Sequence, residues 1–181
     1  MIPRIRPFVF AIGAVALLTA RPALAGPPLL CFPFEIGQAR SLPMGSMEKG
    51  NWHAIDPNYD VSHLVDDTLA LLTPQTPVMV RMETIRRATI YASTHPQIAA
   101  TLLKKLQDRA SVPQPTAGLA VFDFGYLVET FKEAKGMFSE PIPALDQIDG
   151  YQLVLKAHAL QNDAAMQRAA RLIVGGKPSK G

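Results

Sequence analysis

The chain has 181 residues, with 18 lysine or arginine residues against 15 aspartate or glutamate residues and a formal net charge of +3. This length suits one domain with a hydrophobic core of its own. The single cysteine excludes an intramolecular disulfide, and the small net charge gives no support to functions that need a strongly basic surface.

The first 25 residues have the organisation of a cleavable secretory signal peptide. Arg4 and Arg6 give a basic start, residues 8–20 are uncharged and mostly apolar, and Ala23-Leu24-Ala25 has the small-x-small pattern of a cleavage site. The apolar run is too short for a membrane-spanning helix, which needs about 20 residues. We therefore expect cleavage between Ala25 and Gly26, export to the periplasm or the extracellular space, and a soluble product without stable membrane insertion.

Cleavage would change the charge of the chain. Three arginines leave with the signal peptide and no acidic residue does, so the product has 15 basic and 15 acidic residues. This balance argues against nucleic acid as a partner. Cys31 follows Leu29 and Leu30 rather than a small residue, so we do not expect it to carry a lipid.

Residues 26–59, called the arm below, are rich in proline and glycine and show no sustained periodicity. Apolar residues recur along the arm, too many for a solvated disordered tail. We expect the arm to be extended and to pack across a helical body, with an edge strand possible over Cys31–Ile36.

Residues 60–176 have the periodicity of a helical domain, and residues 177–181 are expected to be a frayed tail. Aspartates, prolines and glycines at the boundaries predict five to six helices. The predicted segments are Asp60 to Leu72, Pro77 to the break at His95-Pro96, Pro96 to a point before Pro113, Leu119–Lys135, Ala144–Gln161 and Ala164–Val174. In the fourth helix, Gly125 predicts a close approach by another backbone, because an interior glycine costs about 1 kcal/mol relative to alanine.

Two of the predicted hairpins share a spacing of small residues. One hairpin, in residues 77–110, has Ala88, Tyr91 and Ala100, and the other, in residues 144–176, has Ala157, Leu160 and Ala169 at the same spacing. The spacing resembles that of tetratricopeptide-type repeats, although Lys104 replaces a bulky residue in the first copy. The resemblance implies a scaffold that binds proteins or peptides.

Cys31 is the first candidate for chemistry, because a thiolate is a nucleophile that a histidine can activate. Its surroundings, Leu29-Leu30-Cys31-Phe32, are apolar and would raise the pKa of the thiol. We favour a packed thiol, with an intermolecular disulfide as a further possibility. A thiol enzyme would assemble Cys31, His53 and Glu35 into a polar cleft.

A divalent metal is the second possibility. His63, Asp66 and Asp67 share one helix face, and His53 could reach them if the arm folded back. Acidic residues near a helix start have a simpler role in the helix dipole. We favour that role, and no cofactor or metal is expected.

The remaining charged residues and histidines fit structural roles. We expect Arg81, Arg86 and Arg87, interleaved with Glu83, to form a solvated helix face with ion pairs, and we expect the same of Lys104, Lys105 and Arg109. His95 and His158 are expected at a turn and at the edge of the core.

Taken together, these patterns predict an all-α exported protein whose helices form antiparallel hairpins, arranged either as a solenoid or as an irregular bundle. The expected function is binding of an unknown protein or peptide partner. The alternative is an envelope enzyme or a ligand- or metal-binding protein that uses arm residues such as Cys31 and His53.

Overall fold

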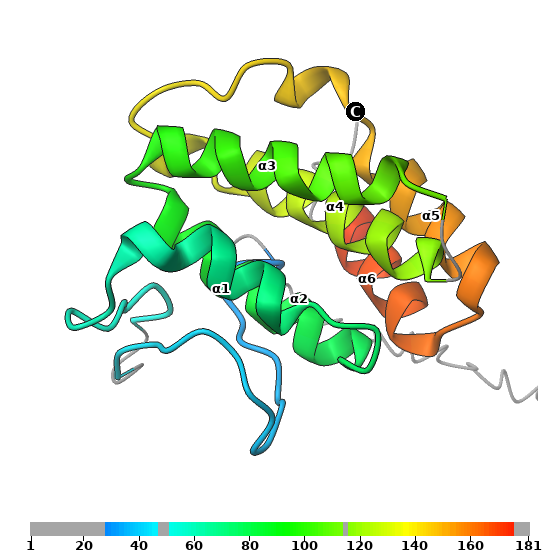
Figure 1. The fold of residues 1–181 in the computed structure, drawn as a ribbon, viewed down its shortest axis with the longest axis horizontal. Helices are drawn as coiled ribbons and strands as arrows, with labels where there is room; N and C mark the ends of the chain where they lie inside the picture. Colours follow the sequence, from blue (N-terminus) through cyan, green and yellow to red (C-terminus); the bar gives the residue numbers. More distant parts are fainter. Residues whose placement is uncertain (1–27, 47–50, 114–115, 176–181) are drawn as a thin grey trace, which may run out of the picture.

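Helices make up all the regular structure in the part of the chain that the structure describes. The computed structural model describes residues 28–46, 51–113 and 116–175, and within them it contains six α-helices and no strand (Figure 1). The helices are α1 (Leu64–Leu71), α2 (Val78–Ala92), α3 (Pro96–Ser111), α4 (Ala117–Glu133), α5 (Gly150–Gln161) and α6 (Ala164–Gly175). The all-α prediction is confirmed, whereas the predicted signal peptide and the tail at 177–181 lie outside the described residues.

Acidic caps fix two helix starts as the sequence predicts. The Asp60 carboxylate accepts a hydrogen bond from the backbone N–H of Ser62 at 3.0 Å, and a short 3-10 helix, η2 (Val61–His63), leads from there into α1. The Asp163 carboxylate accepts from the N–H of Ala165 at 2.7 Å at the start of α6. Both contacts satisfy N–H groups that have no partner inside the helix.

The fifth helix begins later than predicted. Ala144 has a φ of 59°, in the left-handed region, and the chain then makes only a 3-10 turn, η4 (Leu145–Gln147). Asp149 caps α5 by accepting a hydrogen bond from the N–H of Gln152 at 3.0 Å. The prediction of a continuous helix from Ala144 was wrong, because Ala144 is left-handed and the extended conformation of Ile148, with φ −95° and ψ 123°, ends the 3-10 turn before α5.

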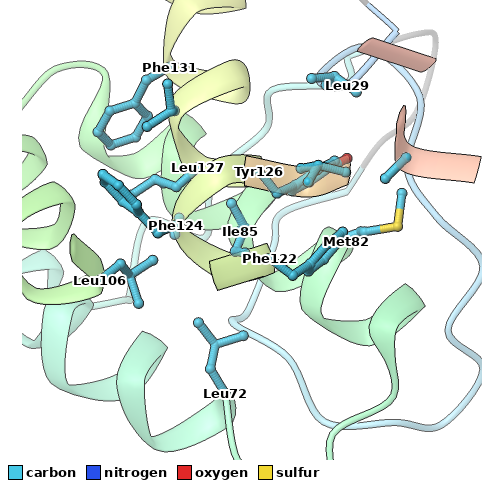
Figure 2. Packing of buried hydrophobic residues seen from close by; sticks show 14 of the residues in the cluster. Leu29, Leu72, Met82, Ile85, Leu106, Phe122, Phe124, Tyr126, Leu127 and Phe131 are labelled. Carbon is cyan, nitrogen blue, oxygen red and sulfur yellow. The ribbon is translucent and has the colours of Figure 1, made fainter. Parts of the chain in front are cut away.

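Helix α4 lies at the centre of the molecule and packs against α2, α3, α5 and α6. In Figure 1 it lies behind α3, with α5 and α6 beyond its other side and the arm below α1 and α2. Its side chains are buried from Ala120 to Phe131. Figure 2 shows the core that results, with contributions from Met82 and Ile85 of α2, Leu106 of α3, and Phe122, Phe124, Leu127 and Phe131 of α4.

The close crossing predicted at Gly125 is present and joins α4 to α5. A Cβ atom at Gly125 would lie 2.8 Å from the carbonyl oxygen of Gly150 and 2.6 Å from the Cβ of Leu153. Gly150 faces it, since a Cβ there would lie 2.5 Å from the carbonyl oxygen of Gly125. The two glycines therefore allow two helix backbones to touch.

The arm packs on the helical body but forms no strand. Leu29, Phe34 and Leu42 are buried in the main core, and Leu30 packs in a smaller cluster with Ile90 of α2. Residues 33–36 are irregular. The suggested edge strand at Cys31–Ile36 was therefore wrong, because the arm's main chain bonds to side chains of α2 instead of to another strand.

The repeat-like spacing corresponds to crossings only in part. Ala157 and Ala169 are fully buried in α5 and α6, but Ala100 of α3 is exposed. Of the two arrangements left open, helices gathered around a central α4 form an irregular bundle, not a solenoid. No helix in the described ranges has the length and apolarity to cross a bilayer.

Candidate functional site

Helix α2 carries charged side chains into the interior. Arg81, Glu83 and Arg86 are at most 1 % exposed. The expectation of a solvated face was wrong for these three residues. A buried charge is costly unless it is paired and hydrogen-bonded, so their partners decide what they do.

Glu83 is the centre of an ionic cluster on α2. Its carboxylate accepts two hydrogen bonds from the Arg86 guanidinium, at 2.8 and 2.9 Å, and one from Arg87 Nε at 2.7 Å. Burial acts against ionisation, but the hydrogen bonds and charge of Arg86, together with hydrogen bonds from the Phe34 N–H and Arg87, outweigh burial and lower the pKa of Glu83. The carboxylate is therefore ionised at neutral pH and holds both guanidinium groups in place.

The same cluster binds the main chain of the arm. Arg86 Nη1 donates to the carbonyls of Leu30 and Trp52, at 2.9 and 3.2 Å, and Arg87 Nη1 donates to that of Leu42 at 2.6 Å. The backbone N–H of Phe34 donates to Glu83 at 2.9 Å. Because these contacts are made to the arm's backbone, they fix its path without depending on its side chains.

Two further side chains hold the arm. The Tyr91 hydroxyl donates to the carbonyl of Pro43 at 2.9 Å and accepts from the N–H of Asp56 at 3.0 Å. Glu133 of α4 accepts from the N–H of Leu29 at 2.9 Å. Burial is the main cause that raises the pKa of Glu133, to about 7, and the neighbouring Glu129 carboxylate adds to the shift.

Arg81 holds the connection between α1 and α2. Its guanidinium donates to the carbonyls of Thr73 and Thr76 in this connection, and Nη1 lies 2.5 Å from a carboxylate oxygen of Asp123 on α4. Arg109 of α3 donates to the carbonyl of Leu72 at 2.8 Å. The connection is therefore anchored directly from α2 and α3, and α4 holds Arg81 in place through Asp123.

Asp123 is fully buried and only partly satisfied. Its second oxygen, Oδ1, has no hydrogen-bond partner in the described part of the chain. Burial raises the pKa of Asp123 to about 6, although the charges of Arg81 and Arg109 and the hydrogen bond from Arg81 act in the opposite direction. Its proton affinity is thus far above that of an ordinary aspartate.

A groove of about 550 Å³ lies between the arm and this anchored connection. It is called the arm groove below. Its volume falls within the range of roughly 300–1,000 Å³ typical of ligand sites. The walls are arm residues 39–43, Asp67, Ala70 and Leu71 of α1, Thr73 and residues 75–77 of the connection, and Val80 of α2.

Cys31 lies outside the arm groove, half-buried and not in a disulfide. Burial and the neighbouring Glu133 carboxylate raise the pKa of its thiol, against an opposing effect of Arg86. A raised pKa lowers the thiolate fraction, which is the nucleophilic form. This geometry gives no support to a thiol nucleophile, in line with the apolar sequence around Cys31, and the Glu35 side chain is exposed.

The candidate metal ligands point to other partners. His53 is exposed and packs edge-on against Trp52, and His63 lies 3.8 Å from Asp60. Asp66 is exposed, whereas Asp67 accepts a hydrogen bond from the Tyr59 hydroxyl at 2.8 Å. Among the described residues, no three His, Cys, Asp or Glu side chains are grouped to hold a metal ion.

Sequence reasoning missed the arm-binding role of Glu83, Arg86 and Arg87. One signal was available, because apolar and small residues on almost every side of α2 predicted burial against more than one neighbour. Charged residues within so wide an apolar surface must also be buried. Comparison of the chain with protein-family models, with curated proteins and with solved structures found no match.

Proposed function

We propose that this chain is an exported binding protein that holds a segment of a partner protein in the arm groove. The observation that carries the proposal is the groove itself, about 550 Å³ in volume, with one wall fixed by the buried Arg81. A wall that is ordered before binding lowers the entropic cost of taking up a ligand.

The contacts between the helical body and its own arm also support a binding role. Glu83, Arg86 and Arg87 hold an irregular segment through main-chain contacts. This is the kind of contact by which proteins take up peptides of varied sequence. The arm groove lies along that bound segment, and a partner segment there would run beside the arm.

The export part of the proposal rests on the first 25 residues. Expression of the full chain in a bacterial host, followed by fractionation and N-terminal sequencing, tests it. We expect a product in the envelope or the medium that starts at Gly26. A product that keeps Met1 and stays in the cytoplasm would refute export without affecting the groove.

The binding part is tested by affinity capture from an envelope fraction with two matched variants. Ala70 lines the groove and Ala100 does not, and both are exposed on helices. We expect Ala70→Trp to lose a partner that the wild-type chain and Ala100→Trp retain, with all three equally folded by circular dichroism. Retention of the same proteins by Ala70→Trp would refute the arm groove as the site.

A further inference from the structure

Main-chain groups without partners border the arm groove. Within the described residues, no hydrogen bond reaches the backbone N–H or C=O of Arg40 or Ser41. The next two carbonyls are occupied, since that of Leu42 accepts from Arg87 and that of Pro43 accepts from Tyr91. The stretch at 40–41 in the groove wall thus has two donors and two acceptors without a partner among the described residues. In an extended chain the groups of neighbouring residues face opposite edges, so one bound segment can use those of one residue.

These free groups belong to a firmly held segment. The Ser41 hydroxyl is hydrogen-bonded to Thr84 of α2 at 3.0 Å, and the Leu42 side chain is buried in the core. Residues 39–46 are neither helix, turn nor strand. A fixed non-helical segment with unpaired main-chain groups is a template on which another extended chain can pair.

The groove wall has one basic residue, Arg40, and one acidic residue, Asp67. Arg40 is exposed, and its guanidinium makes no ion pair or hydrogen bond with any described residue. The acidic residue in the groove wall, Asp67, already accepts a hydrogen bond from the Tyr59 hydroxyl. A carboxylate on a bound segment would therefore find an available partner in Arg40.

We infer that the arm groove takes an extended, acidic segment of a partner protein, which pairs its main chain with the backbone at 40–41 and places a carboxylate beside Arg40. This inference rests on the proposed function and specifies how the partner is recognised. Alternate side chains of an extended segment point in opposite directions, so the segment can present one side chain to the groove wall at Leu71 while the next faces solvent.

The test uses pools of blocked pentapeptides on the immobilised mature chain. One pool has glutamate at its centre and varied residues elsewhere, a second has glutamine at its centre, and a third is the glutamate pool with N-methylated peptide nitrogens on both sides of the centre. N-methylation removes main-chain donors and keeps the side chains. Retained peptides are measured by mass spectrometry.

We expect retention of the glutamate pool, with about tenfold weaker retention of the N-methylated pool and of the glutamine pool, as for loss of hydrogen bonds to charged or buried groups. Arg40→Gln is expected to remove the preference for glutamate but not the effect of N-methylation. Ala70→Trp should abolish retention, and Ala100→Trp should not.

Each departure from this pattern overturns a defined part of the inference. Equal retention of the N-methylated pool would refute main-chain pairing, and equal retention of the glutamine pool would refute the role of Arg40. Failure of all pools to bind would overturn the inference as a whole. The proposed function would then be decided separately by the capture experiment with Ala70→Trp and Ala100→Trp.

Discussion

Two tyrosines on neighbouring helices differ in what their hydroxyl groups contact. The Tyr126 hydroxyl of α4 is fully buried and has no hydrogen-bond partner in the described part of the chain, while its ring stacks on Phe122 at 5.5 Å. The Tyr91 hydroxyl of α2 bonds to two backbone groups of the arm. Removal of the Tyr126 hydroxyl should therefore stabilise the fold, whereas removal of the Tyr91 hydroxyl should destabilise it.

We predict that Tyr126→Phe raises the free energy of unfolding by about 1 kcal/mol, because an unsatisfied buried hydroxyl is removed while the ring remains. Tyr91→Phe is the matched control and should lower it by about 1–2 kcal/mol, because two arm contacts are lost. Urea denaturation of both variants measures the difference. A destabilised Tyr126→Phe would mean that the hydroxyl has a partner after all.

Glu83 gives the second prediction at the residue scale. Glu83→Gln keeps the shape of the side chain but leaves Arg86 buried without a counter-charge, so we expect a loss of roughly 3–5 kcal/mol in the free energy of unfolding. Hydrogen exchange at the Phe34 amide, which donates to Glu83, should become faster.

The control for Glu83 is an exposed ion pair of the same kind. Asp108 pairs with Lys104 at 2.9 Å on the surface of α3, and Asp108→Asn should change stability by less than about 1 kcal/mol. If the two substitutions had equal effects, the Glu83 cluster would contribute no more than a surface pair, and its proposed hold on the arm would be wrong.

At the scale of elements, the contact between α4 and α5 depends on two glycines. We predict that Gly125→Ala lowers the free energy of unfolding by about 1–3 kcal/mol, since the new methyl group would clash with backbone atoms of α5. The loss should appear although alanine favours a helix by about 1 kcal/mol over glycine. Thermal and urea denaturation measure it.

Gly136 provides the matched control for this prediction. It lies in the 3-10 turn η3 (Lys135–Met137), and a Cβ atom there would meet nothing within 4 Å. Gly136→Ala should therefore change stability by no more than about 0.5 kcal/mol. A stabilised Gly125→Ala would show that α4 and α5 are farther apart than the structure places them.

The helical elements were largely predictable because their signals are local. Helix starts are marked by Asp60, Asp163 and the prolines, through contacts made within a few residues. Gly125 marked a helix crossing, because a glycine inside a helix lowers its stability unless a close neighbour requires it. The late start of α5 was missed, since neither the left-handed conformation of Ala144 nor the extended conformation of Ile148 has a signature in its residue type.

The candidate site was much less predictable because its contacts are distant in sequence. Arg86 reaches Leu30 and Trp52, and Arg81 reaches Asp123, across separations that no periodicity encodes. The residues named from chemistry alone, Cys31 and His53, form no hydrogen bond with each other among the described residues, although their neighbours Leu30 and Trp52 both accept from Arg86. The inference at the arm groove rests on backbone groups of Arg40 and Ser41 that have no partner among the described residues, which residue types do not reveal.

At the scale of the whole molecule, the arm and the helices form one folded unit. Leu29, Phe34 and Leu42 share the main hydrophobic cluster with side chains from all six helices. Glu133 ties the start of this described arm to α4, and Asp123 ties the α1–α2 connection to the same helix through Arg81. Glu133 and Asp123, two carboxyl groups of α4 with raised pKa values, thus each help to hold a non-helical segment against this helix.

These two groups give the molecule a predictable dependence on pH. The pKa of Asp123 is raised to about 6 and that of Glu133 to about 7, so the folded state binds more protons than the unfolded state over this range. Stability falls with rising pH wherever the folded state holds more protons. The free energy of unfolding should therefore rise as pH is lowered from 7 to 5, with on the order of 1 kcal/mol from Asp123.

At still lower pH, Glu83 acts in the opposite direction on the free energy of unfolding. Its pKa is lowered in the folded state, so its contribution is present above the ordinary glutamate range and is lost as the pH falls below it.

The pH dependence from Asp123 and Glu133 is measured by urea denaturation at pH 5 and pH 7 at constant ionic strength, comparing the wild-type chain with an Asp123→Asn, Glu133→Gln double variant. Because the two proteins differ only at these two positions, the difference between the two pH dependences isolates the two carboxyl groups. An unchanged dependence in the double variant would show that neither carboxyl group binds its proton more tightly in the folded state.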